Sequence, residues 1–143
     1  MSVTVTAQSL PSYRQLIAAG NHTLFSDMKP AEGQSETAPE PYDLLLGAWG
    51  ACTNMTIQLY ATRKQWPLEN VSTRLQKTTG EDGQILLRKT IQLWGPLSDE
   101  QVKRLKIIAE KCPINQLITH QGNPPRIEST LEALGSINMA PTQ

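Results

Sequence analysis

The chain has 143 residues, the common size of one domain, and we expect residues 1–143 to fold as a single domain. Its 13 Lys and Arg residues balance 13 Asp and Glu residues, so the formal net charge is zero and gives no electrostatic basis for binding nucleic acid or an anionic membrane. Two cysteines exclude a disulfide scaffold, and the apolar run over residues 44–52 is too short to span a bilayer. The first residues lack the pattern of a secretory signal, so we expect a cytoplasmic protein.

The amino-terminal part of the chain predicts three strands. Residues 2–6 alternate apolar and polar side chains, which is the pattern of a half-buried strand. Residues 13–19 and 22–27 flank Gly20 and Asn21, a pair suited to a two-residue hairpin turn. The predicted register places Ala19 opposite His22, Leu16 opposite Phe25, and Arg14 opposite Asp27.

Residues 29–41, rich in Pro, Glu, Gly, Ser and Thr, predict a loop, and residues 41–63 predict one long helix. Pro41 suits the first helical position, and Asp43 adds favourable negative charge to the first turn. The helical spacing predicts an inward face made of Leu45, Ala48, Cys52, Met55 and Leu59. Because the opposite side is also largely apolar or small, we expect a helix buried at the centre of the fold.

The rest of the chain predicts a hairpin, two helices and a final strand. Ser98 and Gln101 have the spacing of a capping box at the start of the first of these helices. That helix must break at Cys112, because a residue before proline avoids the α region. The other elements are strands over residues 71–78, 85–94 and 126–134 and a short helix over residues 113–119. This order of strands and helices predicts the α+β class.

The two cysteines allow two interpretations. Free cysteine is among the most buried residue types, so Cys52 and Cys112 could both be small packing residues. Alternatively they form a dithiol, in which one thiolate attacks a peroxide, becomes a sulfenic acid and condenses with the other thiol. The pattern by itself favours Cys112 as the more readily ionised thiol, because it precedes the helix that starts at Pro113. Apolar surroundings in the long helix are expected to raise the pKa of Cys52, unless a cation lies nearby.

Two segments resemble motifs of one known family. Residues 39–53, Pro-Glu-Pro-Tyr-Asp-Leu-Leu-Leu-Gly-Ala-Trp-Gly-Ala-Cys-Thr, resemble the first-cysteine helix of the OsmC/Ohr family. Residues 109–114, Ala-Glu-Lys-Cys-Pro-Ile, resemble the second-cysteine motif of the same family. The order of elements also fits over nearly the whole chain, and residues 20–27 are similar to a pattern of the OsmC-like branch.

The resemblance implies antiparallel sheets packed around a long central helix, in an intertwined homodimer with two active sites at the subunit interface. It implies cysteine-dependent reduction of organic hydroperoxides in oxidative stress defence, with Cys52 as the peroxidatic cysteine and Cys112 as the resolving cysteine. It also implies no bound metal, haem or flavin, and an external dithiol or a lipoyl-bearing protein as reductant. These roles reverse the order of acidity that the pattern favours, because an arginine and a glutamate activate the first cysteine in such enzymes.

The chain departs from the family pattern at those two activating residues. The family glutamate lies ten positions before the first cysteine, where this chain has Tyr42. Of the neighbouring carboxylates, Glu40 ranks above Asp43, because Asp43 points to the side of the helix opposite Cys52. Arg14 corresponds to the family arginine, although a cross-strand pair with Asp27 would explain it equally well.

Other functions stay open at this point. The alternative to a peroxidase is an OsmC-like dimeric protein that binds a ligand or senses redox state without turnover, and a third candidate is a structural dimer. A zinc site is not expected, because the spacing of His22 and His120 from the cysteines matches no ligand pattern. Trp49, Trp66 and Trp94 are expected to be core or interface residues, and the alternative for Trp49, one turn before Cys52, is an apolar wall for an alkyl hydroperoxide.

Overall fold

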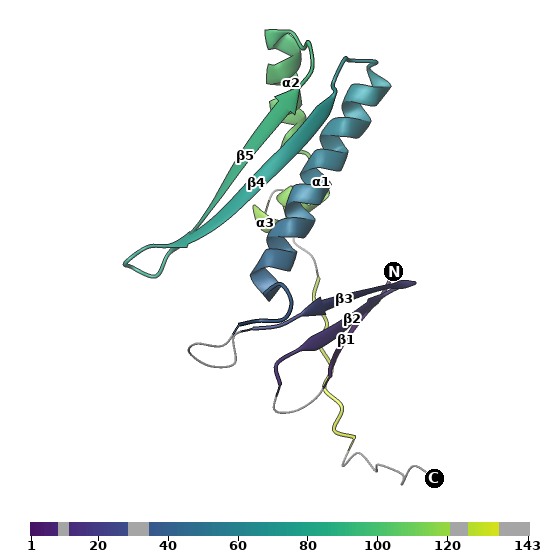
Figure 1. The fold of residues 1–143 in the computed structure, drawn as a ribbon, viewed down its shortest axis with the longest axis vertical. Coiled ribbons are helices and arrows are strands. Elements are labelled where there is room, and N and C mark those ends of the chain that lie inside the picture. Colours follow the sequence, from purple (N-terminus) through teal and green to yellow (C-terminus); the bar gives the residue numbers. More distant parts are fainter. Residues whose placement is uncertain (9–11, 29–34, 121–125, 135–143) are drawn as a thin grey trace.

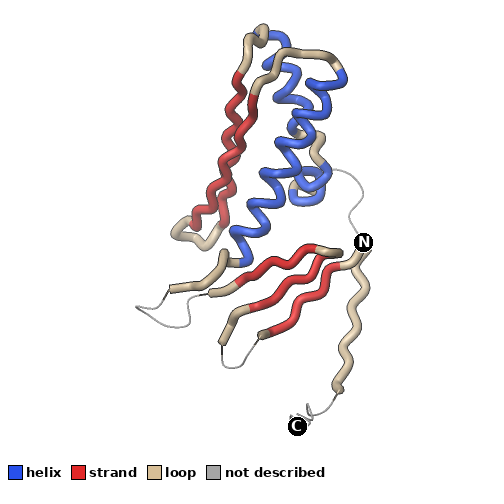
Figure 2. Tube along the Cα trace, turned by 45° about the vertical axis from the view of Figure 1, so that its right-hand side comes forward, coloured by secondary structure: helices blue, strands red, loops and turns tan. Residues whose placement is uncertain are grey.

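The computed structural model describes residues 1–8, 12–28, 35–120 and 126–134, which form an α+β fold (Figure 1). The elements are β1 (Val3–Ala7), β2 (Gln15–Ala19), β3 (His22–Ser26), α1 (Pro41–Arg63), β4 (Asn70–Thr79), β5 (Ile85–Trp94), α2 (Asp99–Ala109) and α3 (Pro113–Ile118). The β4–β5 hairpin and the three helices pack together, and the sheet of β1, β2 and β3 lies beyond the amino-terminal end of α1 (Figure 2). The predicted class is therefore confirmed. Within the predicted loop, residues 29–34 lie outside the described residues, and residues 35–40 form neither helix nor strand.

The amino-terminal sheet is antiparallel, with strand order β1–β2–β3. The predicted hairpin register is confirmed, since Ala19 lies opposite His22 and Leu16 lies opposite Phe25. Gly20 adopts a φ of 59° in the turn, a conformation that glycine reaches without a steric penalty. The expectation of a half-buried β1 is not met within one chain, because Val3 is 58% exposed and Val5 is 57% exposed.

The long helix α1 begins and ends where the sequence predicts. Pro41 occupies its first turn, and a carboxylate oxygen of Asp43 accepts a hydrogen bond from the Glu40 backbone N–H at 3.1 Å. This bond satisfies one of the backbone donors near the helix start, so Asp43 acts as a helix cap. Beyond Arg63, Gln65 adopts a φ of 55° and the chain turns toward β4.

The predicted inward face of α1 is wrong for a single chain. Leu45, Met55 and Leu59 are 45%, 60% and 67% exposed. The face that packs instead follows Gly50, whose missing side chain admits Leu75 of β4, since an added Cβ would lie 3.2 Å from the Leu75 Cδ1. The buried residues of α1 are Trp49, Gly50, Thr53, Ile57 and Ala61. Because both sides of α1 are rich in apolar or small residues, periodicity could not decide which side meets the hairpin.

The core lies between α1, α2 and the β4–β5 hairpin. Strands β4 and β5 pair antiparallel from Asn70 opposite Trp94 to Thr79 opposite Ile85, as the alternating pattern predicts. The buried core cluster consists of Ile57, Ala61, Val71, Leu105 and Ala109. Burial of these side chains fixes α2 against α1, which determines where the chain emerges toward Cys112.

The start of α2 and the break between α2 and α3 follow the predicted signals. The Ser98 hydroxyl oxygen accepts from the Gln101 N–H at 3.2 Å, and the Gln101 side-chain oxygen accepts from the Ser98 N–H at 2.9 Å, which confirms the capping box. Helix α2 ends at Ala109, and Cys112 is the residue that caps α3, with a φ of −54° and a ψ of 126°. The predicted break before Pro113 is confirmed.

The prediction of a final strand over residues 126–134 is wrong for this chain, since these residues form neither strand nor helix. Ile127, Leu131 and Leu134 are 81%, 90% and 87% exposed. A strand needs a neighbouring strand to pair its backbone N–H and C=O groups. Within the described residues the sheets consist of β1–β2–β3 and β4–β5 only, and the segment pairs with neither.

Candidate functional site

Two helices place Cys52 beside Cys112, although the two residues are far apart in the sequence. Cys52 lies in the middle of α1 and is half-buried, whereas Cys112 lies at the start of α3 and is 0% exposed. The Cys112 thiol is close enough to Cys52 to influence its ionisation. Both cysteines are free thiols in this structure. Proximity of the two thiols is the first requirement for a dithiol.

The ionisation of Cys52 is set mainly by its burial. Burial raises the pKa of the Cys52 thiol above its ordinary value, and the neighbouring Cys112 thiol raises it further. The backbone N–H of Ile114 and the hydroxyl of Thr56 act in the opposite direction. This direction agrees with the expectation for a cysteine within an apolar helix. With its pKa raised, Cys52 of a single chain is mainly the protonated thiol at neutral pH. The nucleophilic form is the thiolate, so Cys52 needs a further group that lowers its pKa.

A group of polar side chains lies beside Cys112 and centres on Asn115, which is 1% exposed. The Asn115 backbone N–H donates to the Cys112 Sγ at 3.5 Å. The Asn115 Oδ1 accepts from the Trp49 Nε1–H at 3.1 Å and from the Lys89 Nζ at 2.9 Å. The Asn115 Nδ2 donates to the Glu110 backbone oxygen at 3.2 Å and to its Oε2 at 3.0 Å. We call Trp49, Lys89, Glu110 and Asn115 the amide clamp.

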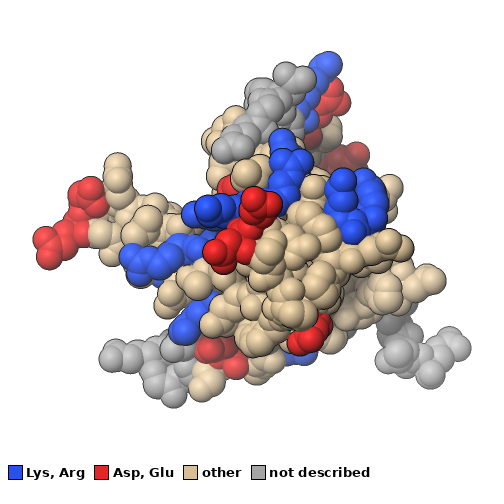
Figure 3. Space-filling model, turned by 90° about the horizontal axis from the view of Figure 1, so that it is seen from above, with Lys and Arg blue, Asp and Glu red and all other residues tan. Residues whose placement is uncertain are grey.

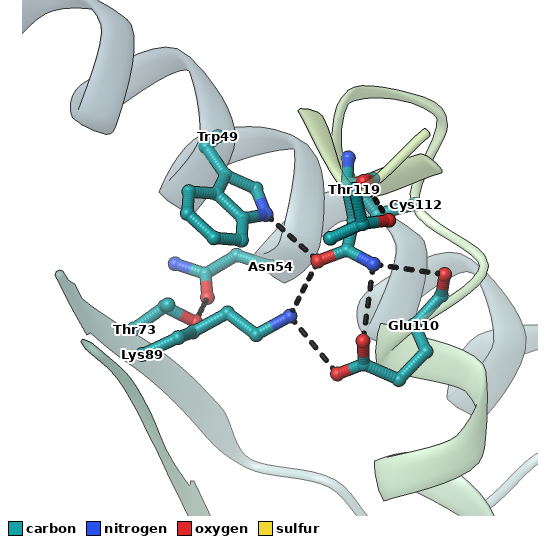
Figure 4. Close-up of polar contacts among 8 residues, drawn as sticks. Trp49, Asn54, Thr73, Lys89, Glu110, Cys112 and Thr119 are labelled. Carbon is teal, nitrogen blue, oxygen red and sulfur yellow. Dashed lines mark hydrogen bonds and ion pairs between the residues drawn. The ribbon is translucent and has the colours of Figure 1, made fainter. Parts of the chain in front are cut away.

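The amide clamp draws on four elements of the fold or their ends. Figure 4 shows the side chains of Trp49, Lys89 and Glu110 pointing toward one another from α1, β5 and the segment after α2. Lys89 and Glu110 also form an ion pair at 3.0 Å, in which the Lys89 side chain is only 12% exposed. The Lys89 Nζ lies 5.2 Å from the centre of the Trp49 ring. The largely buried Lys89 ammonium thus lies one residue away from the buried thiol of Cys112, with Asn115 between them.

Sequence reasoning missed Lys89, Glu110 and Asn115 as residues of the site. The signal for Lys89 was present, because it occupies the inward side of β5, where its neighbours Leu87 and Ile91 are partly buried and apolar. A lysine at such a position needs a partner, since a buried charge is costly when it is unpaired. Asn115 and Glu110 gave no such signal, because their roles depend on the contact between α3 and β5.

The structure does not place Glu40 beside Cys52. Glu40 caps the start of α1, about 18 Å along the helix axis from Cys52 at the standard rise per residue. Arg14 lies at the same end of α1, where it binds the segment that enters the helix. Its guanidinium donates to the Gln8 side-chain oxygen at 2.8 Å and to the Thr37 backbone oxygen at 3.3 Å. Neither predicted activating residue therefore contacts Cys52 within this chain.

The expected pair of Arg14 and Asp27 is bridged by Thr37. A carboxylate oxygen of Asp27 accepts from the Thr37 N–H at 3.0 Å and from its hydroxyl at 2.7 Å, and Arg14 donates to the same hydroxyl oxygen. The Thr37 hydroxyl and N–H are the main causes that lower the pKa of Asp27, and Arg14 contributes least. Arg14 also stacks on Phe25, with its guanidinium carbon 4.3 Å from the ring centre.

Other parts of the described chain add no metal-ligand group. His22 lies exposed on β3, and His120 follows α3 with a φ of 55°. Among the described residues, no three His, Cys, Asp or Glu side chains gather as ligands for a metal ion. None of the described helices has the length and apolar character needed to cross a membrane. On the face seen in Figure 3, acidic and basic side chains lie side by side, in keeping with the zero net charge.

Comparison with known proteins identifies what the chain is similar to. A family model described as OsmC-like protein matches residues 33–128, which include both cysteines and the amide clamp. No curated protein matches this sequence.

Solved structures share the fold. The OsmC-like protein from Mycoplasma pneumoniae has 17% sequence identity and a TM-score of 0.68, with 84% of this chain and 87% of that chain covered. The organic hydroperoxide resistance protein OsmC from Legionella pneumophila has 21% identity and a TM-score of 0.59, over 87% of this chain and 92% of that chain. The organic hydroperoxide resistance protein OhrB of Bacillus subtilis has 20% identity and a TM-score of 0.59, over 87% and 93%. At these identities the likeness establishes the fold.

Proposed function

Because this chain belongs to the OsmC-like protein family, we propose that it reduces organic hydroperoxides with the Cys52–Cys112 pair. The observation that supports the proposal is that the half-buried thiol of Cys52 in α1 lies near enough to the buried thiol of Cys112, at the start of α3, for Cys112 to affect its ionisation. Two relatives in fold are named as organic hydroperoxide resistance proteins. Thiol chemistry of this kind needs no metal or organic cofactor in the protein.

The two cysteines have different roles in the proposed reaction. The Cys52 thiolate attacks the distal oxygen of the hydroperoxide, the O–O bond breaks, and the alkoxide leaves as an alcohol after taking up a proton. Cys52 is now a sulfenic acid, and the Cys112 thiol attacks its sulfur, which releases water and forms the disulfide. Cys52 is the half-buried and Cys112 the fully buried thiol, so the peroxide reaches Cys52 first. An external dithiol or lipoyl-type reductant then restores both thiols, in a cytoplasmic compartment that keeps them reduced.

The proposed reaction takes place in a homodimer, and a second copy covers the apolar surface that one chain leaves exposed. The exposed apolar side chains include Leu45, Met55 and Leu59 on α1 and, separately, Ile127 and Leu131 on the final segment. Monomeric soluble proteins seldom expose apolar surface on this scale. Residues 126–134 have the alternating pattern of a strand but pair with no strand in the described part of their own chain, and a sheet edge of the second copy would supply a partner.

The dimer also offers a source for the missing positive charge. Cys52 has a raised pKa in one chain, and Arg14 of the same chain is bound at the far end of α1. We therefore expect Arg14 of the second copy to complete the site and to lower the pKa of Cys52, with Glu40 of that copy holding the guanidinium in place. The catalytic set is thus Cys52, Cys112, Arg14 and Glu40.

Mixed dimers test the origin of Arg14. Cys52→Ser and Arg14→Met homodimers are both expected to be inactive or nearly so. The heterodimer of the two variants is purified through different tags. If Arg14 acts across the interface, one of its two sites combines an intact Cys52 with an intact Arg14. The heterodimer should then recover about half of the wild-type peroxidase rate. A heterodimer that stays as inactive as its parents would show that Arg14 acts within its own chain or not at all. A solution mass of one chain would contradict the dimer itself.

Thiol titration tests the peroxidase proposal directly. The reduced protein has two thiols per chain. After one equivalent of cumene hydroperoxide per chain, we expect both to be lost and to return on addition of a dithiol. Protein that keeps both thiols, and that consumes no peroxide with any dithiol present, would instead support the ligand-binding alternative, which the raised pKa of Cys52 in one chain favours.

A further inference from the structure

Asn115 has a side chain whose hydrogen-bonding capacity is fully used. An amide has two acceptor positions on its oxygen and two N–H donors. The Asn115 Oδ1 faces two donors, the Trp49 Nε1–H and the Lys89 Nζ, at 3.1 and 2.9 Å. Its Nδ2 faces two acceptors, both on Glu110, at 3.2 and 3.0 Å. Because donors and acceptors lie on opposite sides, the orientation of the amide is determined by chemistry, and a flipped amide would lose all four bonds.

The amide clamp holds the part of α3 that contacts the cysteines. The backbone N–H of Asn115 donates to the Cys112 Sγ at 3.5 Å, and Asn115 and Cys112 are 1% and 0% exposed. The preceding N–H, that of Ile114, acts on Cys52. A buried polar side chain that makes all of its hydrogen bonds tolerates little movement, because any shift would break some of them. The clamp therefore fixes both backbone donors relative to the two sulfur atoms.

The difference in exposure between the two cysteines determines which sulfur of their disulfide an external thiolate attacks. Cys52 is partly accessible, and Cys112 is completely buried. An external thiolate therefore attacks the Cys52 Sγ, and the sulfur that leaves is Cys112. The departing thiolate is formed next to the Asn115 N–H, and Lys89 is the cation on the other side of the same residue. Hydrogen bonds to a thiolate favour its departure.

We propose that Asn115 is a positioning residue for reduction of the Cys52–Cys112 disulfide, held by Trp49, Lys89 and Glu110 so that its backbone N–H receives the leaving Cys112 thiolate. The inference rests on the proposed function for the existence of that disulfide. A thiolate of the external dithiol attacks Cys52, and the disulfide bond breaks with its electron pair moving to Cys112. The second thiol of the reductant then displaces Cys52 from the mixed disulfide. The dithiol is oxidised to a disulfide, and its two protons end on Cys52 and Cys112.

The test uses an exchange of amide and carboxylate. Asn115→Asp keeps the acceptor for Trp49 and Lys89 but replaces the Nδ2 donors by a carboxylate oxygen facing Glu110, so the clamp is broken by repulsion. The double variant N115D/E110Q replaces the Glu110 carboxylate by an amide, whose N–H groups can donate to the new carboxylate at position 115. It also keeps the net charge of the wild type. E110Q alone is the companion variant: the amide has one oxygen for two donors, the Lys89 Nζ and the Asn115 Nδ2, so one of the two bonds that the Glu110 carboxylate makes is lost.

The measured quantity is the rate at which dithiothreitol opens the disulfide, recorded against pH. The disulfide is formed with diamide, so that no step depends on peroxide. We expect N115D to open about tenfold more slowly than wild type across the pH range, because the pH dependence comes from the attacking dithiol and the leaving group changes the rate at every pH. The double variant should lie within about threefold of wild type, and E110Q should lie between wild type and N115D. The rate at which cumene hydroperoxide oxidises Cys52 should fall by a smaller factor than the opening rate in N115D, because the clamp contacts Cys112 directly and acts on Cys52 only through the Ile114 N–H.

A second readout identifies the sulfur that is attacked. Oxidised wild-type protein is treated with excess glutathione, quenched in acid, unfolded and alkylated, and the two cysteines are then mapped by mass spectrometry. We expect glutathione on Cys52 and the alkyl group on Cys112. The reverse assignment, or a double variant as slow as N115D alone, would overturn the proposal. So would a failure of diamide to form the disulfide in wild type, whereas a disulfide formed by diamide but never by peroxide would refute only the peroxidase.

Discussion

A Cys52→Ser variant is expected to consume cumene hydroperoxide no faster than buffer alone, a loss of at least about 100-fold from the wild-type rate. The serine hydroxyl is nearly isosteric with the thiol, so the half-buried position in α1 should accept it without unfolding the helix. It lacks the nucleophilic thiolate, however, and no sulfenic acid can form. Peroxide loss in the presence of dithiothreitol measures the effect.

Cys112→Ser separates the two cysteine roles. This variant should react once with peroxide and then stop, because no second thiol is present to condense with the Cys52 sulfenic acid. Dimedone should label it at Cys52 and should leave Cys52→Ser unlabelled. A Cys52→Ser variant that turned over peroxide at the wild-type rate would eliminate Cys52 as the nucleophile. Dimedone labelling of Cys112 in the Cys52→Ser variant would exchange the two roles.

Gly95→Ala is expected to lower the free energy of unfolding by roughly 3 kcal/mol or more, or to prevent folding. Gly95 joins β5 to α2 with a φ of 133°, a conformation that side-chain-bearing residues rarely adopt. An added Cβ would overlap the carbonyl oxygen of Pro67 and lie 3.0 Å from the Glu69 N. Both contacts are backbone atoms, and the Glu69 N–H is bound to the Trp94 oxygen at 2.8 Å, so neither can move aside easily. Denaturant titration followed by circular dichroism measures the loss.

Gly83→Ala is the matched control for backbone strain. Gly83 has a φ of 80° in the turn between β4 and β5, but an added Cβ there meets no atom within 4 Å. The expected cost is about 1 kcal/mol, from the left-handed conformation alone. Equal losses in the two variants would show that the close approach of Pro67 contributes nothing. The comparison matters for the site because α2, which starts after Gly95, determines where Cys112 lies.

Local signals in the sequence determined the course of the chain. The Gly20–Asn21 pair set the first hairpin, Pro41 set the start of α1, and Pro113 set the break at which Cys112 lies. Each of these signals acts within a few residues, through backbone sterics or a hydrogen bond that the neighbouring residues supply. The family resemblance rests on the same kind of local signal around the two cysteines. The chain order and the α+β class were therefore readable without coordinates.

Tertiary packing decided which surfaces and side chains meet. The helical spacing of Leu45, Met55 and Leu59 marks an apolar face of α1 but not whether the chain itself or a second molecule covers it. Residues 126–134 alternate like a strand, yet a strand exists only where another strand accepts its hydrogen bonds. Lys89 and Asn115 come from β5 and α3, whose contact depends on the packing of both against α1. Hydrogen bonds and burial between distant residues depend on three-dimensional distance, which the spacing of residues along one chain does not contain.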